Sequence, residues 1–141
     1  FHDDQHGTAI ITTAALINAL DITKKKIGEV KIVVNGAGAS AMACANLFKK
    51  SGVPQKNITM VDRTGVIYNG RENLNQWKSA HAIETKHRTL SDAINNADVM
   101  IADIDSIDLE IDSQDHNEII NSVKRMSKPL GIVDCLFLIV I

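Results

Sequence analysis

The sequence predicts an α/β fold built on a doubly wound, mostly parallel sheet. Three observations support this fold class. Short β-branched segments alternate with helical stretches along the chain. A glycine-rich turn joins the first of these strands to the helix that follows it. Hydrophobic residues make up 45% of the 141 residues and charged residues 23%, which is typical of one globular domain with a core.

The predicted elements follow one another in a regular order. The first seven residues are polar and predict a loop, whereas residues 8–20 are almost all apolar, Ala or Thr and predict a buried helix. Residues 21–29 form a charged, solvated connector, and residues 103–115 are acidic and irregular. Strands are predicted at residues 31–35, 57–61, 66–68 and 99–102. Further helices are predicted at residues 39–50, 77–83, 90–95 and 116–126. The apolar run at residues 136–141 is either an inner strand or an exposed end.

Composition excludes several function classes. Lys and Arg number 15 against 17 Asp and Glu, so the net charge of −2 provides no basic surface for nucleic acid or an acidic membrane. Aromatic residues make up only 4%, which leaves few platforms for stacking single-stranded bases. Cys44 and Cys135 show no CxxC spacing and are expected to be small buried residues in a reducing, cytoplasmic compartment. We therefore expect no nucleic acid and no membrane among the partners.

The sharpest motif is the glycine-rich turn after the first strand. Residues 36–41 read GAGASA, which matches G-x-G-x-x-G/A with a strand before it and a helix after it. Gly36 would permit the tight turn, Gly38 would allow a pyrophosphate to approach the backbone, and Ala41 would keep the helix close to the sheet. The predicted cofactor-binding stretch is Gly36, Ala37, Gly38, Ala39 and Ser40. This context predicts a Rossmann-type dinucleotide-binding domain that takes NAD or NADP, with the phosphates at the helix N-terminus.

An acidic residue ends the second predicted strand. Asp62 could accept hydrogen bonds from the ribose hydroxyls of NAD, whereas the adjacent Arg63 could bind the 2′-phosphate of NADP. Both cofactors stay open at this point. The alternative is a simple glycine turn followed by a solvated carboxylate.

Four polar residues crowd into the first loop. His2, Asp3, Asp4 and His6 precede the first predicted helix. Adjacent carboxylates could bind Mg²⁺ or Mn²⁺, or they could cap the helix. One short loop cannot complete a metal shell, so further ligands would have to come from elsewhere.

Taken together, these motifs resemble a known family, the bacterial malic enzymes. The stretches FHDDQHGTA, KIVVNGAGASA, MVDRTGVIY and GR carry the resemblance, which covers about residues 1–101. It implies oxidative decarboxylation of L-malate to pyruvate and CO₂ with NAD or NADP and Mg²⁺ or Mn²⁺. It further implies that Asp4 is a metal ligand, that Asp3 belongs to the hydrogen-bond network of a catalytic lysine, and that Thr8 lies close to the cofactor.

The resemblance also implies that this domain is incomplete. Residues 1–141 would form an NAD(P)-binding domain without the N-terminal catalytic domain, which in the family supplies a lysine, a tyrosine and a Glu-Asp pair. Residues 102–141 diverge, because residues 102–112 carry five acids and the Asn-Pro segment of the family is absent. The full-length protein is expected to form a homodimer or larger homo-oligomer and to act on malate. Two alternatives stay open: a nucleotide-binding or vestigial fragment without turnover, and malolactic-type decarboxylation.

Other residues have simpler interpretations. Trp77 is expected to pack in the interior, whereas His81 and His87 are expected at the surface. Lys24–Lys26 is interpreted as a solvated run. Gly52 stands where a C-terminal glycine of the helix at residues 39–50 is expected.

Overall fold

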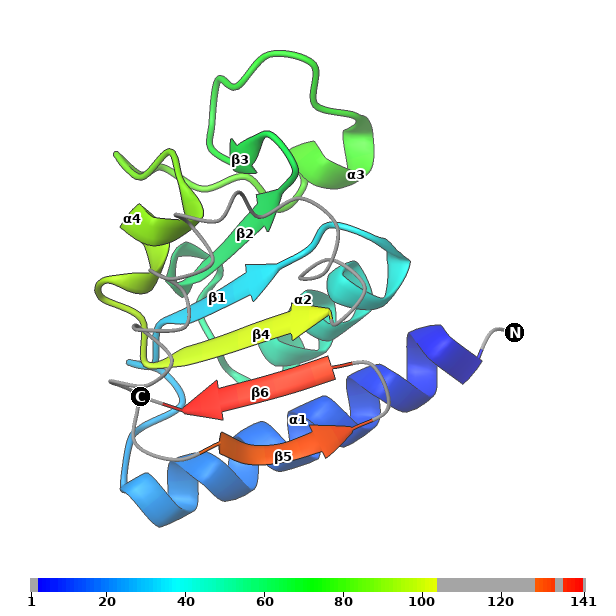
Figure 1. Ribbon diagram of the computed structural model, residues 1–141, viewed down its shortest axis with the longest axis vertical. Coiled ribbons are helices and arrows are strands. Elements are labelled where there is room, and N and C mark those ends of the chain that lie inside the picture. Colours follow the sequence, from blue (N-terminus) through cyan, green and yellow to red (C-terminus); the bar gives the residue numbers. More distant parts are fainter. Residues whose placement is uncertain (1–2, 104–128, 134–135, 141) are drawn as a thin grey trace, which may run out of the picture.

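A computed structural model describes the backbone of residues 3–103, 129–133 and 136–140, and the side chains of residues 6–102. These residues form five helical segments and six strands (Figure 1). The helical segments are α1 (Asp3–Thr23), α2 (Ala39–Ser51), the 3₁₀ turn η1 (Gln55–Asn57), α3 (Gln76–Ser79) and α4 (Leu90–Ile94). The strands are β1 (Ile32–Asn35), β2 (Ile58–Asp62), β3 (Gly65–Val66), β4 (Val99–Asp103), β5 (Pro129–Val133) and β6 (Leu136–Val140).

The six strands form one sheet in the order β3-β2-β1-β4-β6-β5. β1 pairs in parallel with both β2 and β4, so Ile32 lies opposite Ile58 on one side and Val99 on the other. β3 pairs antiparallel with β2, and β6 pairs antiparallel with both β4 and β5. Only two residues separate β2 from β3 and β5 from β6, and so short a link cannot cross over to a parallel neighbour. The expected parallel sheet is therefore confirmed for β2, β1 and β4 and not for β3, β5 and β6. β6 lies inside the sheet, as one of the two interpretations predicted.

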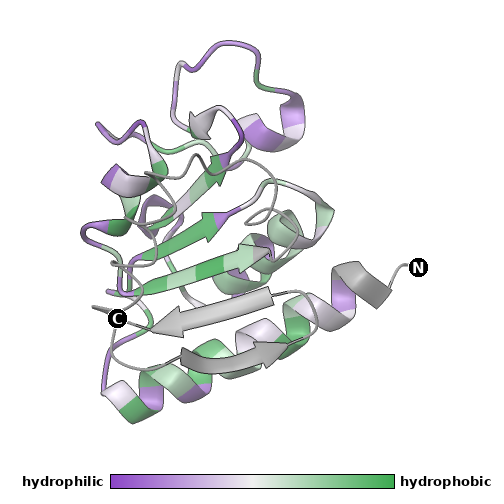
Figure 2. Cartoon of the chain, in the orientation of Figure 1, coloured by the Kyte–Doolittle hydropathy of each residue, from purple (hydrophilic) through white to green (hydrophobic). Residues whose placement is uncertain are grey.

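Helices cover both faces of this sheet, which confirms the doubly wound fold. On one face α1 and α2 bury apolar side chains against β1, β2 and β4; this core includes Leu16, Leu20, Cys44, Phe48, Ile32, Val34 and Met60. On the other face α4 packs against alternate strand residues, in a second cluster with Val33, Val61, Ala93, Ile94 and Met100. Figure 2 shows β1, β2 and β4 as the hydrophobic centre of the chain. Alternate burial on both faces explains why these strands read as continuous apolar runs.

Helix α2 ends as the sequence predicts. Gly52 adopts φ +113°, a left-handed conformation that glycine accepts at low cost, and its N–H bonds to the carbonyls of Lys49 and Phe48. Cys44 is fully buried against α1. Burial raises the pKa of its thiol to about 11, although a hydrogen bond with Thr12 acts in the opposite direction. Cys44 is thus a core residue, and Cys135 lies outside the described residues.

Two predictions for α1 are wrong. The helix begins at Asp3, so residues 3–7 are helical rather than a loop. Acidic residues in a first turn interact favourably with the helix dipole, which explains how this polar stretch continues the helix. The helix is also buried on one face only: Ile10 is 61% exposed and Ile22 67%, while Leu16 is fully buried.

The segment between β3 and β4 departs furthest from the sequence predictions. Instead of a helix over residues 77–83, α3 forms a single turn. Trp77, predicted to pack inside, is 66% exposed, and His81, predicted at the surface, is buried. Burial lowers the pKa of His81, and the charge of Lys49 acts in the same direction. Helical periodicity carries no information over so short an element, because one turn has no second face to define.

The residues from Thr89 to Asp98, which lead into β4, are held by several side-chain hydrogen bonds. A capping box joins Thr89 and Asp92 at the start of α4, where the sequence places a helix start. Asp98 accepts a 2.6 Å bond from Lys25 Nζ and a 2.9 Å bond from the Lys31 N–H. Lys25 is therefore half-buried in an ion pair rather than solvated like Lys24 and Lys26.

The expected acidic stretch up to residue 115, apart from Asp103 in β4, and the helix at residues 116–126 lie outside the described residues. Across residues 3–103 and the two C-terminal strands, no helix combines the length and apolarity needed to cross a membrane.

Candidate functional site

The glycine-rich loop lies between the end of β1 and the start of α2. Gly36 adopts φ +133°, a conformation that side-chain-bearing residues rarely accept. Its N–H donates to the carbonyl of Val61 at 2.8 Å, which fixes the beginning of the loop to β2. The tight turn predicted for Gly36 therefore occurs at the carboxyl ends of the parallel strands, where nucleotides bind in open α/β sheets.

The backbone of Gly38 and of the first turn of α2 is accessible from solvent on one side of this loop. Gly38 is exposed, and a Cβ placed on it would meet no atom within 4 Å. It serves as the helix N-cap without a side chain, and the Met42 N–H donates to its carbonyl at 3.0 Å. The N–H groups before Met42 have no carbonyl one turn back within the helix. Ala37 packs against the core and Ala41 is buried. Open backbone in front of an uncapped helix N-terminus fits a pyrophosphate.

Asp62 ends β2 beside this loop and is held in a dense polar cluster. Its Oδ1 accepts bonds from the Thr64 N–H at 3.0 Å and from Arg71 Nη2 at 2.7 Å. Its Oδ2 accepts a bond from Lys78 Nζ at 2.6 Å. The Thr64 hydroxyl donates to Oδ1 at 2.9 Å, and Arg71 also contacts that hydroxyl. Only 9% of the Asp62 side chain is exposed.

The cluster decides the charge of Asp62. Burial on its own would raise the pKa of this carboxyl group, but the hydrogen bonds from Lys78, Arg71 and Thr64 outweigh burial and lower the pKa to about 2. Asp62 is therefore ionised at neutral pH and neutralised by two cations, rather than solvated. Arg63, the next residue, is exposed.

Sequence reasoning missed Arg71 and Lys78 as members of this cluster. Arg71 belongs to the GR stretch that supports the family resemblance, and this was its only signal. Lys78 gives no signal, because it reaches Asp62 from 16 residues further along the chain. The N-cap of α3 explains the contact: the Asn75 side chain accepts from the Lys78 N–H at 2.8 Å and so sets the direction of this turn.

The start of α1 lies on the same side of the molecule as the loop. Both α1 and α2 begin at the right of Figure 1 and run in the same direction. Thr12 hydrogen-bonds to Cys44, so Thr8, one turn earlier, is level with the first turn of α2. Asp3 and Asp4 occupy the first turn of α1 and their side chains lie outside the described part. Among the side chains of residues 6–102, no three His, Cys, Asp or Glu groups gather as a metal site.

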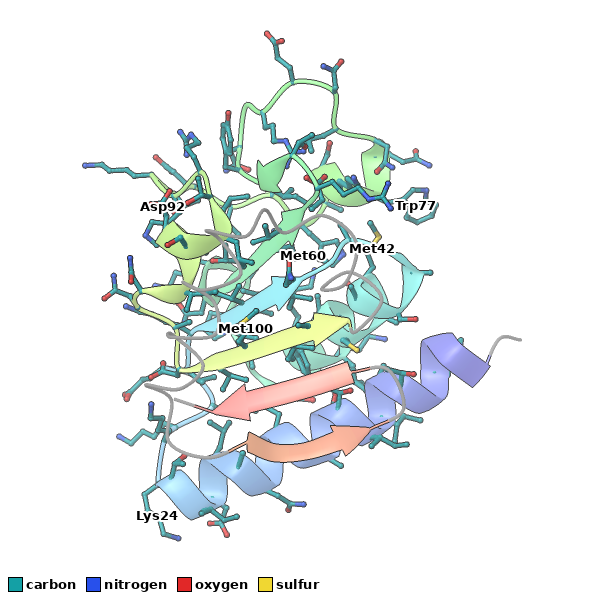
Figure 3. The ribbon with its side chains drawn as sticks, viewed as in Figure 1. Lys24, Met42, Met60, Trp77, Asp92 and Met100 are labelled. Atoms are coloured by element: carbon teal, nitrogen blue, oxygen red, sulfur yellow. The ribbon has the colours of Figure 1, made fainter. Side chains whose placement is uncertain are left out.

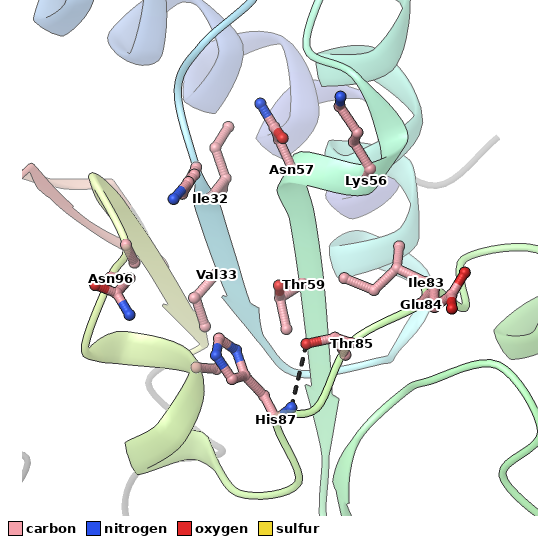
Figure 4. Close-up of a pocket in the computed structure, with 13 residues that line it drawn as sticks. Ile32, Val33, Lys56, Asn57, Thr59, Ile83, Glu84, Thr85, His87 and Asn96 are labelled. Atoms are coloured by element: carbon pink, nitrogen blue, oxygen red, sulfur yellow. Dashed lines mark hydrogen bonds between the residues drawn. The ribbon is translucent and has the colours of Figure 1, made fainter.

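A separate pocket of about 240 Å³ lies at the opposite ends of β1 and β2 (Figure 4). Lys31 and Asn57, which precede or begin those strands, help to line it, together with Thr59, Asn96 and His87. His87 is thus half-buried in this pocket rather than at the surface. Because the glycine-rich loop stands at the carboxyl ends of the strands, this pocket lies at the other edge of the sheet from that loop.

Comparison with known proteins agrees with this geometry. Residues 5–111 match the family described as malic enzyme, NAD binding domain. The NADP-dependent malic enzyme of Halomonas elongata is 54% identical over 101 residues, which cover 72% of this chain and 24% of that protein. The bifunctional malic/malolactic enzyme of Bacillus subtilis is 46% identical over 106 residues, covering 72% and 25%.

Solved structures give the same result. The crystal structure of the NAD-dependent malic enzyme from Thermotoga maritima aligns with a TM-score of 0.64 at 39% identity, covering 72% of this chain and 28% of that one. The chain thus spans about a quarter of the length of these proteins. The family match includes the glycine-rich loop, Asp62 and most of α1. The chain therefore belongs to the malic enzyme family, and its match is to the NAD-binding domain of that family.

Proposed function

We propose that this chain is the NAD(P)-binding part of an enzyme that converts L-malate and NAD(P)⁺ into pyruvate, CO₂ and NAD(P)H. The observation that carries the proposal is the open backbone at Gly38, in front of the uncapped N-terminus of α2. The family membership of residues 5–111 supports the choice of reaction.

Each part of the site has a role in this proposal. The Gly36–Ser40 stretch binds the pyrophosphate through backbone N–H groups, and the Asp62 cluster faces the adenosine ribose. Thr8 lies level with the loop and contacts the cofactor. Asp4 binds Mg²⁺ or Mn²⁺, and Asp3 supports the catalytic lysine of another domain. The metal would supply Lewis-acid stabilisation of the negative charge on the oxygen at C2 of the substrate.

The rest of the proposal concerns the whole protein. Residues 1–141 form the cofactor domain of a longer chain, which would contribute the catalytic lysine and tyrosine and pair into a homodimer or larger assembly. We place this protein in the cytoplasm, because Cys44 is a buried thiol that needs no oxidising compartment. Residues 102–141 are a divergent end of the domain.

The Asp62 cluster favours NADP over NAD. A lone carboxylate would repel a 2′-phosphate, but Arg71 and Lys78 neutralise Asp62, and Arg63 adds a further positive charge beside it. The cluster thus has a net positive charge. Calorimetric titration of the chain with each cofactor is expected to give tighter binding of NADP. Absence of binding for both cofactors would reject the cofactor role altogether.

Replacing Lys78 with alanine is expected to weaken NADP binding about tenfold, because one charge-assisted bond to the 2′-phosphate is lost. NAD binding should change much less, since Asp62 Oδ2 becomes free to accept from a ribose hydroxyl. Calorimetry with both cofactors measures the two effects. Lys26→Ala, which removes an exposed lysine that also has an acidic partner, is the control. An equal loss for both cofactors would contradict the proposed role of Lys78.

A malolactic reaction is the second candidate, and a binding fragment without turnover is the third. The malolactic activity named for the Bacillus relative favours the second. Incubation of the full-length protein that contains this domain with malate, Mn²⁺ and either NAD or NADP distinguishes them: pyruvate indicates the malic reaction, lactate the malolactic one, and no product a binding protein without turnover.

A further inference from the structure

Trp77 is the one tryptophan of the chain, and it stands out because 66% of it is exposed. A large aromatic side chain that faces water does not contribute the free energy of stabilisation that its burial would give. The indole belongs to an ordered turn, since the Asn75 side chain caps the single turn of α3 that contains Trp77. Its exposed position is therefore built into the fold.

The position of α3 brings this indole to the cofactor edge of the sheet. Lys78, the next residue, reaches Asp62 at the end of β2, and Gly36 of the phosphate loop is bonded to the preceding Val61. Figure 3 shows Trp77 on the same side of the molecule as Met42, which lies in the first turn of α2. The indole thus stands on the same turn as the lysine that reaches Asp62, at the edge of the sheet where the ribose of a bound dinucleotide would lie.

An adenine ring beyond that ribose would be stabilised by an aromatic side chain on which it could stack. Among the described side chains, the other aromatic rings do not offer one. Phe48 is fully buried. The Arg88 guanidinium lies over the Tyr68 ring, 3.7 Å from its centroid. Trp77 is the remaining ring in that part of the chain, and indoles stack well on nucleobases.

We infer that the Trp77 indole is the stacking platform for the adenine ring of the dinucleotide. The inference rests on the proposed cofactor role and adds a residue and a contact to it. Lys78 and Trp77 then act as neighbours in one turn: the lysine faces the 2′-position of the ribose and the indole faces the base.

The single tryptophan makes a direct test possible. The chain is titrated with adenosine 2′,5′-bisphosphate, which carries the base, and with nicotinamide mononucleotide, which does not. Binding is followed by calorimetry and by indole fluorescence excited at the red edge of its absorption. We expect strong quenching by the adenine compound at the concentrations where calorimetry detects binding, and none by the mononucleotide. Calorimetric binding without a change in fluorescence would overturn the inference while leaving the cofactor role intact.

Variants test the energetic contribution of the ring. Trp77→Ala is expected to weaken binding of adenosine 2′,5′-bisphosphate about tenfold or more, and Trp77→Phe is expected to retain most of it. Ile22→Ala removes a side chain of similar exposure from the far end of α1 and should have no effect. Unchanged affinity in Trp77→Ala would overturn the stacking role alone. Failure of the unmodified chain to bind any adenine nucleotide would reject the proposed cofactor role and this inference with it.

Discussion

Replacing Gly38 with valine is expected to reduce NADP affinity by about 100-fold or more while leaving the fold intact. The backbone at Gly38 has φ −79°, which valine also accepts, and a Cβ there would meet no protein atom within 4 Å. The added side chain would instead occupy the space through which the pyrophosphate approaches α2. Two lost charge-assisted bonds to the phosphates are sufficient for an effect of this size.

A matched control separates binding from stability. Gly28 lies in the turn before β1, where a Cβ would also meet open space, so Gly28→Val makes the same chemical change away from the loop. Both variants should unfold in urea close to the unmodified chain, and calorimetry should show a loss of NADP binding only in Gly38→Val. Unaltered binding in Gly38→Val would place the phosphates elsewhere.

The conformation of the glycine-rich loop could be predicted because its information is local. A strand, two glycines and a helix within about 20 residues determine the turn, the exposed backbone and the helix N-terminus, and all three depend on neighbouring residues. The φ of +133° at Gly36 and the buried position of Ala41 are the structural counterparts of the motif. The three central strands were predictable for the same reason, since burial on both faces makes each one a short apolar run.

The residues around Asp62 could not be predicted, because they meet across the chain. Lys78 reaches the carboxylate only because one turn of helix, capped by Asn75, points it back toward β2. Neither hydropathy nor periodicity records such a contact. The exposure of Trp77 has the same origin, since the ring shares its turn with Lys78, whose ion pair with Asp62 fixes the orientation of that turn.

The start of α1 was mispredicted for a different reason. The polarity of residues 3–7 is typical of a loop, yet acidic residues also suit the first turn of a helix. The carboxylates of Asp3 and Asp4 have chemical roles in the proposed function. The polarity of this stretch therefore reflects those roles and does not indicate a loop. A functional stretch at a helix end therefore misleads sequence reasoning about where that helix begins.

The Asp62 cluster should also govern how the stability of the chain depends on pH. The pKa of Asp62 in the folded protein is about 2, below the ordinary value of 3.8. A carboxyl group with a depressed folded pKa stabilises the fold fully above its unfolded pKa, and this contribution is lost as the pH falls toward the folded pKa. The loss therefore falls between about pH 4 and pH 2 and amounts to about 2 kcal/mol for this side chain.

Asp62→Asn is expected to lower the free energy of unfolding at pH 7 by about 2 kcal/mol, because Arg71 and Lys78 lose the charge that compensates them in a largely buried setting. At pH 2 most of the difference between the variant and the unmodified chain should be lost, since Asp62 is then half protonated in the folded state. Urea unfolding followed by circular dichroism at pH 7, 4 and 2 measures both differences. Glu29→Gln, which removes an exposed carboxylate 3.9 Å from Lys26, is the control and should follow the unmodified chain throughout. A constant difference between Asp62→Asn and the unmodified chain from pH 7 to pH 2 would mean that packing, rather than charge, sets the contribution of this side chain.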